Sequence, residues 1–336
     1  MTLAAPTLAQ VAVAAGVSAM TVSRALNRRP GVSSSLRESI VKLAAEMGYE
    51  SSRAARQATG QGRVLGVLAG HLDKPFISHL VAGVVGAASA TGNEVLIYSL
   101  ADRQRRPPAK VLKLLQQFTD GVIALLPPAS GFVAALSEGR YPLVTIDNPA
   151  EPCTHPTVAA DSYGGARAAM HHLAELGHRR VAFVTGAEQL ASAHQRRRAY
   201  DDAVPVLGLA REPGLLVPGD YTLAGGRRAG ERLLKLKHRP TAVFASNDLS
   251  AFGLMAVLQE SGLKIPDDVS VVGFDDLPAA RQIHPMLTTV RQPIEDLGRA
   301  AVHTLLALIA GLPAAATQVI LPTELVVRQS TRAPRR

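Results

Sequence analysis

From residue 63 onward, short apolar runs alternate with longer segments of helical periodicity, and this alternation limits the fold more than any other feature. The runs form two series, at 64–70, 94–100, 121–126 and 142–147, and then at 179–186, 241–246 and 269–276. Helical segments are expected at about 76–90, 108–118 and 249–261. Apolar runs of this kind are typical of parallel strands that helices cover on both faces. We therefore predict an α/β protein with two doubly wound parallel sheets, one in each of two lobes.

The first fifty residues instead predict three short helices. Residues that can cap or interrupt a helix stand between the apolar stretches: Thr7 with Gln10, Gly16, Ser18 and Ser33. The spacing of Val22 and Leu26 turns both side chains inward from the second helix. A helix, a turn that contains glycine and a second helix make up the helix-turn-helix pattern.

The same end of the chain carries most of the excess positive charge. Residues 1–63 hold eight lysines and arginines against three glutamates, a net +5 of the +9 of the whole chain. Such asymmetry favours a polyanionic partner, although a soluble basic surface would look the same. A generic three-helix bundle is the alternative to DNA binding. The terminal position, the local charge and the following linker favour double-stranded DNA.

The start of the second predicted helix has the residue types that suit a DNA groove. Arg24 can bind guanine or phosphate, and the hydroxyls of Ser18, Thr21 and Ser23 can reach phosphate oxygens. Ala19 and Met20 offer apolar contact, as to thymine methyl groups. The predicted DNA-binding residues of this region are Thr7, Ser18, Ala19, Met20, Thr21, Ser23, Arg24 and Asn27.

Several motifs, in the same order along nearly the whole chain, resemble the lactose/galactose repressor family. They include TLAQVAVAAGVSAMTVSRALN near the start, GHRRVAFVTG, SNDLSAFGL, and IPDDVSVVGFDDLPAARQIHPMLTTVRQP. The resemblance implies a homodimer on a pseudo-palindromic operator, with Ala19, Met20 and Arg24 at the base-reading positions. It also implies a regulatory domain like the periplasmic sugar-binding proteins, which binds a small sugar-like effector. It leads us to expect a transcriptional repressor.

Residues 51–62 contain no apolar residue larger than alanine and are expected to form a hinge or linker. By the resemblance, this hinge inserts a leucine into the minor groove, but the matching residue here is Ala58. A methyl group is a poor wedge between base steps, so we expect weaker bending of the operator. Arg53 and Arg56 would add phosphate contacts.

Polar residues at the ends of predicted strands form the candidate effector site. Asp147 and Asp275 each end an apolar run and Asn247 follows another, so all three fall where doubly wound sheets bind ligands. A carboxylate accepts two hydrogen bonds from sugar hydroxyls. Arg196 could hold ring hydroxyls or an acidic ligand, and Tyr221 and Phe76 could stack on its apolar faces.

Each of these residues could instead have a purely structural role. Taken singly, the strand-end aspartates could serve a turn or a helix cap, and the two aromatic residues could belong to a core. The resemblance supports all six residues as effector contacts. Asp161 and Asp276 are instead expected to be caps, and Arg197 and Arg198 a solvated face.

Other classes of function lack their motifs. The sequence has no GxxxxGK[ST] loop, HExxH site or GxSxG elbow, so we expect neither an enzyme nor a bound cofactor or metal. Cys153 is the single cysteine, and His171 with His172 lies in a helical pattern without ligand partners. With no signal peptide or membrane span in the pattern, a cytoplasmic protein is expected. A periplasmic solute-binding protein is the remaining rival, but it would not need the first fifty residues.

The expected organisation therefore has three parts. Residues 1–50 form the DNA-binding headpiece, 51–62 the linker, and 63–336 the effector-binding and dimerisation domain. Within that domain, the N-lobe is expected over about 63–159 plus 292–320, and the C-lobe over about 160–291 plus 321–332. The C-terminal segment RQSTRAPRR has no heptads, which favours a dimer over a tetramer held by a leucine zipper.

Overall fold

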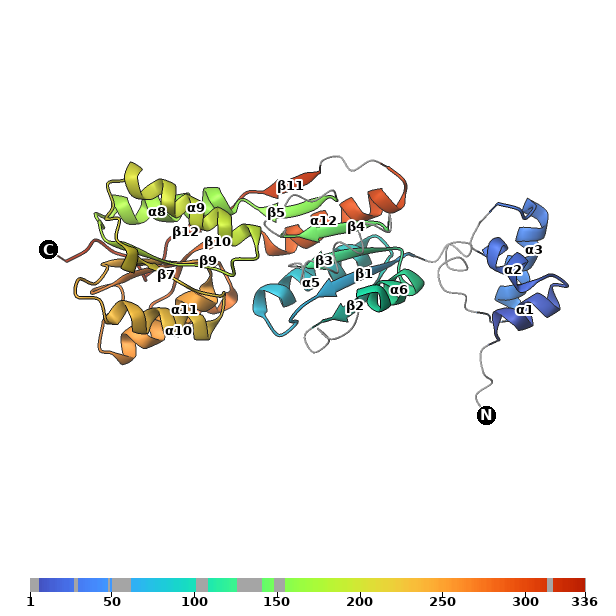
Figure 1. Cartoon of the computed structure of the whole chain (residues 1–336), viewed down its shortest axis with the longest axis horizontal. Coiled ribbons are helices and arrows are strands. Elements are labelled where there is room, and N and C mark those ends of the chain that lie inside the picture. Colours follow the sequence, from blue (N-terminus) through green and yellow to red (C-terminus); the bar gives the residue numbers. More distant parts are fainter. Residues whose placement is uncertain are drawn as a thin grey trace.

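The structure is a computed structural model that describes residues 6–26, 30–47, 49, 62–100, 108–125, 141–147, 155–312 and 317–335. Figure 1 shows a bundle of three N-terminal helices and two lobes, each built on one sheet. The predicted α/β class is confirmed, since each lobe contains a six-stranded sheet with helices on both faces.

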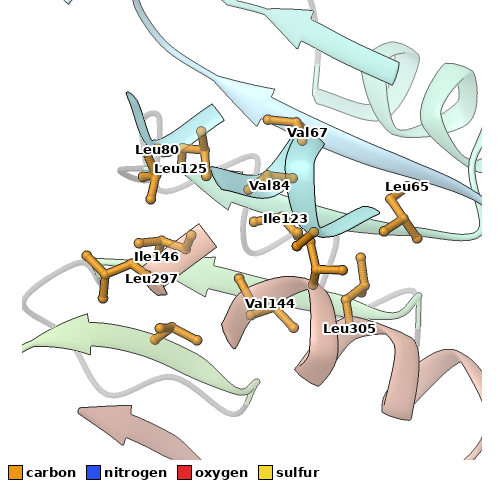
Figure 2. Close-up of a cluster of buried hydrophobic side chains, with 14 of the residues drawn as sticks. Leu65, Val67, Leu80, Val84, Ile123, Leu125, Val144, Ile146, Leu297 and Leu305 are labelled. Atoms are coloured by element: carbon orange, nitrogen blue, oxygen red, sulfur yellow. The ribbon is translucent and has the colours of Figure 1, made fainter. Parts of the chain in front are cut away.

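The N-lobe sheet has the strand order β11-β5-β4-β3-β1-β2. Its strands are β1 (Val64–Ala69), β2 (Glu94–Ser99), β3 (Gly121–Leu125), β4 (Leu143–Ile146), β5 (Thr157–Ala160) and β11 (Gln318–Leu321). Helices α5 (Pro75–Ala90) and α12 (Ile294–Ile309) pack on one face, and α6 (Pro108–Phe118) packs on the other. Figure 2 shows side chains of the α5 and α12 face, where Leu80 and Leu297 belong to one buried cluster with Leu125 and Ile146 of the sheet. This face is an aliphatic core.

The C-lobe sheet has the order β12-β10-β9-β8-β6-β7. Its strands are β6 (Val181–Val184), β7 (Leu216–Val217), β8 (Ala242–Ala245), β9 (Ser270–Asp275), β10 (Thr288–Arg291) and β12 (Glu324–Val326). Helices α8 (Ser162–Glu175) and α9 (Ala191–Val206) cover one face, and α10 (Leu223–Leu234) and α11 (Asp248–Glu260) cover the other. Short 3-10 turns, η1 (Pro213–Leu215) and η2 (Pro278–Arg281), lie in the connections.

One strand departs from the predicted all-parallel pattern. Strand β12 pairs antiparallel with β10, whereas the other strand pairs of the described sheets are parallel. The reason is topological: β12 follows β11 after two residues and enters the other lobe, so no helix turns the chain back into the parallel direction.

The chain crosses between the two lobes three times within the described residues. The crossings lie between β5 and α8, between β10 and α12, and between β11 and β12. Each crossing is short: one residue lies between β5 and α8, and two residues lie in each of the other crossings. Short crossings of this kind are typical of hinges between lobes.

The headpiece contains α1 (Leu8–Ala14), α2 (Ala19–Leu26) and α3 (Ser34–Glu46). The predicted capping box is confirmed: the Thr7 hydroxyl accepts from the backbone N–H of Gln10, and the Gln10 side chain accepts from the backbone N–H of Thr7. Val22 and Leu26 are buried as predicted. No single helix among the described residues is long and apolar enough to cross a membrane; α1 and α2 meet that test only when counted together, across a 103° bend.

Candidate functional site

The helix-turn-helix geometry rests on one glycine. Gly16 has φ +63°, a conformation that costs little only for glycine, and it lies in the turn where the chain bends by 103° between α1 and α2. Val17 packs against the headpiece core beneath this turn. The second helix is therefore held at a steep angle with its start displayed to solvent.

The predicted base-reading residues lie on the open face of α2. Ala19, Met20 and Arg24 are exposed, and the Met20 side chain is 65% exposed although it is apolar. A large apolar side chain such as Met20 is unfavourable in water, so its exposure is typical of a surface that contacts a partner. The same face therefore presents a cation and an apolar surface together.

The hydroxyl residues of this region have roles within the headpiece as well. The Ser18 Oγ accepts from the backbone N–H of Thr21 at 3.0 Å, which caps α2 as expected. Thr7 and Ser18 are exposed, whereas Thr21 and Ser23 are half-buried. Four further predicted DNA-binding residues, Asn27, Arg53, Arg56 and Ala58, lie outside the described residues.

Between the lobes, polar residues gather at the carboxyl ends of the strands. Asp147 directly follows β4, Asn247 follows β8 by one residue, and Asp275 ends β9. The strands that precede them are buried along their whole length. The three strand-end residues therefore lie at facing ends of the two sheets, and the region that they form with the contacting residues named below is called the cleft.

A contact between the lobes passes through Asp147. Its carboxylate accepts from the Ser192 hydroxyl at 2.6 Å and from the Ser192 backbone N–H at 3.2 Å, and Ser192 lies on α9 of the C-lobe. Burial raises the pKa of Asp147, and the Ser192 hydrogen bond and the Arg196 charge oppose that rise. An N-lobe carboxylate thus faces donors of the C-lobe.

Arg196 lies one helical turn beyond Ser192 and is only 3% exposed. Its guanidinium stacks on the Phe274 ring at 3.6 Å from the centroid and donates to the Ser246 carbonyl at 2.5 Å. The buried Nε of Arg196 has no hydrogen-bond partner in the described structure. Because an unsatisfied buried donor is costly, this N–H is a place where a ligand oxygen would be stabilising.

Tyr221 forms another side of the cleft. Its hydroxyl lies 3.3 Å from the Ser192 hydroxyl, and its ring lies 5.5 Å from the Arg196 guanidinium carbon. Burial raises the pKa of Tyr221 to about 12, so the hydroxyl keeps its proton. Asn247 caps α11 through its Oδ1 and donates from Nδ2 to the Tyr221 carbonyl at 3.2 Å. Asn247 therefore holds both the Tyr221 backbone and the start of α11.

Asp275 is a second buried carboxyl in the cleft. The Gln292 amide donates to its Oδ1 at 2.6 Å. Burial raises the pKa of Asp275 to about 7, with the Arg196 charge and the Gln292 hydrogen bond acting against it and the Asp147 charge adding to it. Gln292 lies in the crossing between β10 and α12, so this carboxyl is bonded to a segment that joins the lobes.

Backbone strain marks the same region. Among the described residues, the non-glycine residues with positive φ are Asp147 at 56°, Tyr221 at 62°, Asp275 at 127° and Asp276 at 58°. Strained conformations persist where the surrounding structure over-determines them, and they cluster at ligand sites. Three of these residues are predicted effector contacts, so conformation and chemistry point to the same cleft.

Other residues stand differently from the prediction. Phe76 is half-buried at the start of α5 and packs against the N-lobe core, and none of the contacts described above joins it to the C-lobe residues. Asp161 caps α8 as expected, but Asp276 is not a helix cap: it binds three arginines instead.

Two residues of this region, Ser192 and Gln292, were not predicted from the sequence. The four-residue spacing of Ser192 and Arg196 on one helix was the signal for the first.

Comparison with known proteins decides the family. Residues 7–52 match the model of the bacterial regulatory proteins of the lacI family, and residues 170–331 match a periplasmic binding protein-like domain. The chain is 32% identical over 332 residues to the HTH-type transcriptional repressor CytR of Escherichia coli (strain K12), which covers 98% of this chain and 97% of that protein. The chain belongs to the lacI family of bacterial regulatory proteins. The resemblance inferred from the motifs is confirmed.

Further relatives agree along the whole length. This lacI-family chain is 33% identical over 335 residues to the HTH-type transcriptional regulator CelR of Thermobifida fusca, covering 97% of this chain and 98% of that one. A solved CelR–cellobiose complex has a TM-score of 0.74 at 30% identity, covering 97% and 99% of the two chains. The lac repressor dimer bound to operator and the anti-inducer ONPF has a TM-score of 0.75 at 30% identity, covering 98% and 99%.

Membership of this family defines the general role. The lacI-family chain is a DNA-binding transcriptional regulator with a helix-turn-helix headpiece and a two-lobed regulatory domain. Its relatives are named as transcriptional regulators, which is a non-enzymatic role.

Proposed function

We propose that this regulator is a repressor that binds a pseudo-palindromic operator as a homodimer, and that a small polyhydroxylated effector in the cleft controls the binding. The observation that carries the effector proposal is the cluster of Asp147, Arg196 and Asp275 at facing ends of the two lobes, in which Arg196 and Asp275 are buried and Asp147 is half-buried. Buried charges without a metal or a full set of partners are expensive, and they are typical of ligand sites.

The chemistry of these groups favours a ligand with several hydroxyls. Each carboxylate accepts two hydrogen bonds, and the unpartnered Nε of Arg196 supplies a donor. The Tyr221 ring offers an apolar surface against which the carbon face of a sugar ring would stack. A relative has been solved with cellobiose, which supports a sugar or sugar derivative for this chain. We keep Phe76 and Asn247 as further contacts within this proposal.

A homodimer is supported by one surface of the N-lobe. Helix α5 contains no aspartate, glutamate, lysine or arginine, and its outer face carries exposed Ala82, Val85 and Gly86. An uncharged helix face of small residues suits packing against a second copy about a twofold axis. The lac repressor is solved as a dimer on its operator, which supports the same assembly here.

Control of DNA binding would follow from the angle between the lobes. An effector shifts the two states of the regulatory dimer only by its differential affinity for them, and a coupling of about 1–3 kcal/mol is typical. Two headpieces held at the spacing of the half-sites gain operator affinity through effective concentration, and they lose that gain at another spacing.

We also propose that the hinge bends the operator only weakly, because Ala58 is a poor wedge, and that Arg53 and Arg56 bind phosphates.

The experiment combines two steps. Operator sequences are selected from random duplexes with the purified full-length chain, and the effector is then sought by thermal shift over sugars, sugar acids, sugar phosphates and nucleosides. We expect a palindromic consensus and an effector that changes its affinity. Equal binding of palindromic and random DNA at moderate salt would refute the operator role and leave only a solute-binding scaffold. We further propose a cytoplasmic location, with the DNA.

A further inference from the structure

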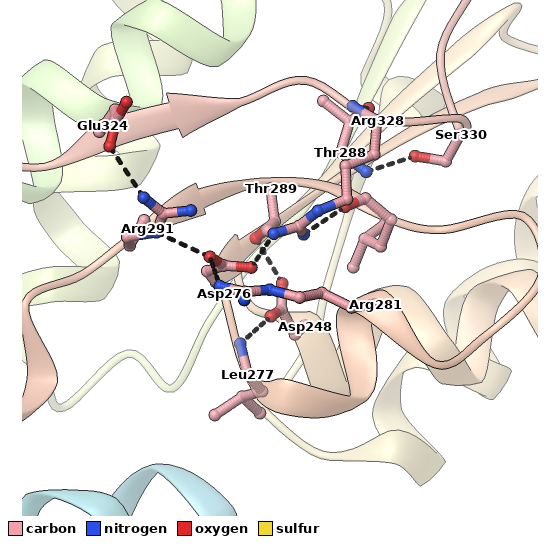
Figure 3. A network of polar contacts seen from close by, with 11 residues as sticks. Asp248, Asp276, Leu277, Arg281, Thr288, Thr289, Arg291, Glu324, Arg328 and Ser330 are labelled. Carbon is pink, nitrogen blue, oxygen red and sulfur yellow. Dashed lines mark hydrogen bonds and ion pairs between the residues drawn. The ribbon is translucent and has the colours of Figure 1, made fainter.

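Asp276 is a buried carboxylate beside the cleft, and the effector site as proposed does not use it. Its side chain is 1% exposed. Its Oδ2 accepts from Arg291 Nε at 2.8 Å and from Arg281 Nη2 at 3.1 Å, and its Oδ1 accepts from Arg328 Nη2 at 2.5 Å. Figure 3 shows the three guanidinium groups converging on this one carboxylate.

The arginines come from separate segments of the C-lobe. Arg281 ends η2, Arg291 is the last residue of β10, and Arg328 follows β12. Arg291 also pairs with Glu324, the first residue of β12, at 3.1 Å. Since β10 leads into one crossing between the lobes and β12 begins just after another, Asp276 is linked by ion pairs to two of the three crossings.

The neighbours of Asp276 are held just as firmly. Asp275 is bonded to the Gln292 amide, and the Leu277 backbone N–H donates to Oδ2 of Asp248 at 2.8 Å. Asp275 and Asp276 both have positive φ, at 127° and 58°. Such a conformation is unfavourable for a residue with a side chain and needs fixed surroundings to persist. The contacts on Asp275, Asp276 and Leu277 together are those surroundings.

Electrostatics keeps the Asp276 carboxyl ionised. Burial acts to raise the pKa of Asp276, but the hydrogen bonds from Arg291, Arg328 and Arg281 outweigh it and hold the pKa below its usual value. Arg328 is itself 9% exposed, so the pair has little solvent to screen it. Replacing the carboxylate by an amide would leave Arg281 and Arg328 without the Asp276 charge, and Arg291 with Glu324 alone.

We propose that Asp276 is a positioning residue, which fixes the strained backbone so that the Asp275 carboxyl faces the cleft and ties that carboxyl to the crossings between the lobes. The proposal rests on the proposed effector function. Asp276 does not touch the ligand in this scheme, and its effect on binding is transmitted through the backbone of Asp275 and through Arg291.

The test compares Asp276→Asn with Asp267→Asn in the full-length chain. Asp267 is a matched control, because its carboxylate also binds arginines, Arg332 and Arg335. It precedes the first residue of β9, whereas Asp276 follows the last one. Two measurements are made on each variant. One is hydrogen–deuterium exchange of the backbone amides, and the other is binding of cellobiose, D-ribose and adenosine by calorimetry.

In Asp276→Asn we expect faster exchange at the backbone amides of residues 275–277 and of Gln292 in the crossing after β10. We also expect about tenfold weaker binding of whichever probe binds the wild type. Asp267→Asn should leave both unchanged, even at an equal loss of melting temperature. Unchanged exchange at 275–277 in Asp276→Asn, or equal effects in both variants, would overturn the proposal.

The variant could fail to fold, or the wild type could bind none of the probes. If Asp276→Asn does not fold, Arg291→Gln replaces it, since the Arg291 side chain is 41% exposed and its loss is tolerated more easily. That variant should show the same faster exchange to a smaller extent, and no change would again overturn the proposal. If none of the probes binds the wild type, the effector proposal fails for those compounds, and the exchange measurement still decides the role of Asp276.

Discussion

The Tyr221 ring lies directly on the backbone of Gly186, so closely that a Cβ on Gly186 would come within 2.2 Å of the ring carbon Cζ. Gly186 follows β6 and Tyr221 precedes α10, so the contact joins two strand-end loops of the C-lobe. The orientation of the Tyr221 ring therefore depends on the absence of a side chain at Gly186, 35 residues earlier in the sequence.

Gly186→Ala is predicted to displace the Tyr221 ring and weaken effector binding by about tenfold, on the scale expected when a binding group is shifted by about 1 Å. The measurement is the ligand-dependent thermal shift of the variant. Gly214→Ala is the control, since a Cβ there meets only the end of the flexible Leu236 side chain and Gly214 precedes β7, at the opposite end of the sheet. A full ligand shift in Gly186→Ala would show that Tyr221 is not a wall of the site.

The strand-end residues could be predicted because the rule behind them is topological. Parallel pairing brings the ends of β8 and β9, with Asn247 and Asp275, to one side of the C-lobe sheet, and it places Asp147 at the same end of the strands in the N-lobe sheet. The network around Asp276 could not be predicted in this way. Its arginines lie 5, 15 and 52 residues away, and only the folded C-lobe brings them together.

The prediction that Asp276 caps a helix was wrong for a physical reason. An aspartate shortly before Leu277 and Pro278 has the local pattern of a helix cap, and local patterns say nothing about buried ion pairs. Gln292 was missed for the same reason: its partner Asp275 is 17 residues away on the neighbouring strand. The headpiece could be predicted almost completely, because its caps and its turn glycine are local signals.

Arg24→Ala is predicted to weaken binding to the selected operator by about 1–3 kcal/mol and to relax the preference at one base pair. Arg24 is exposed on α2, so its loss should not change the fold of the headpiece. Affinities are measured at several salt concentrations, which separates base contacts from phosphate contacts. Lys42→Ala, in an exposed pair with Glu46 on α3, is the control and should bind as the wild type does. If Arg24→Ala discriminates among operator sequences as strongly as the wild type does, Arg24 does not read a base.

The raised pKa of Asp275, about 7, predicts that this carboxyl contributes less to the stability of the effector-free protein as the pH rises. An unfolded aspartate has a pKa of about 4, so between about pH 4 and pH 7 Asp275 binds more protons in the folded state than in the unfolded state. The contribution of Asp275 to the free energy of unfolding must then fall across this window. The charged groups that act on Asp275 are Arg196, Asp147 and Asp248.

Asp275→Asn should flatten this slope in urea unfolding followed between pH 4 and pH 7. Asp276 contributes with the opposite sign: its lowered pKa gives stability that is present above about pH 4 and is lost as the pH falls further. Asp267→Asn is the control, because the pKa of Asp267 is lowered and its window also lies below about pH 4. A slope that is identical in Asp275→Asn and the wild type would rule out Asp275 as its source.

Val85→Lys is predicted to dissociate the homodimer. Val85 is 41% exposed on the uncharged face of α5, and a twofold interface would place the new charge in both copies at once. Like charges at an interface cost several kcal/mol, so the dimer should become a monomer at micromolar concentration in sedimentation analysis. Operator affinity should fall in parallel, because single headpieces lose the gain from effective concentration. The control is Val206→Lys, at a valine that is 77% exposed at the end of α9 and is not part of the α5 face. A dimer that survives Val85→Lys but not Val206→Lys would move the interface from α5 to the end of α9.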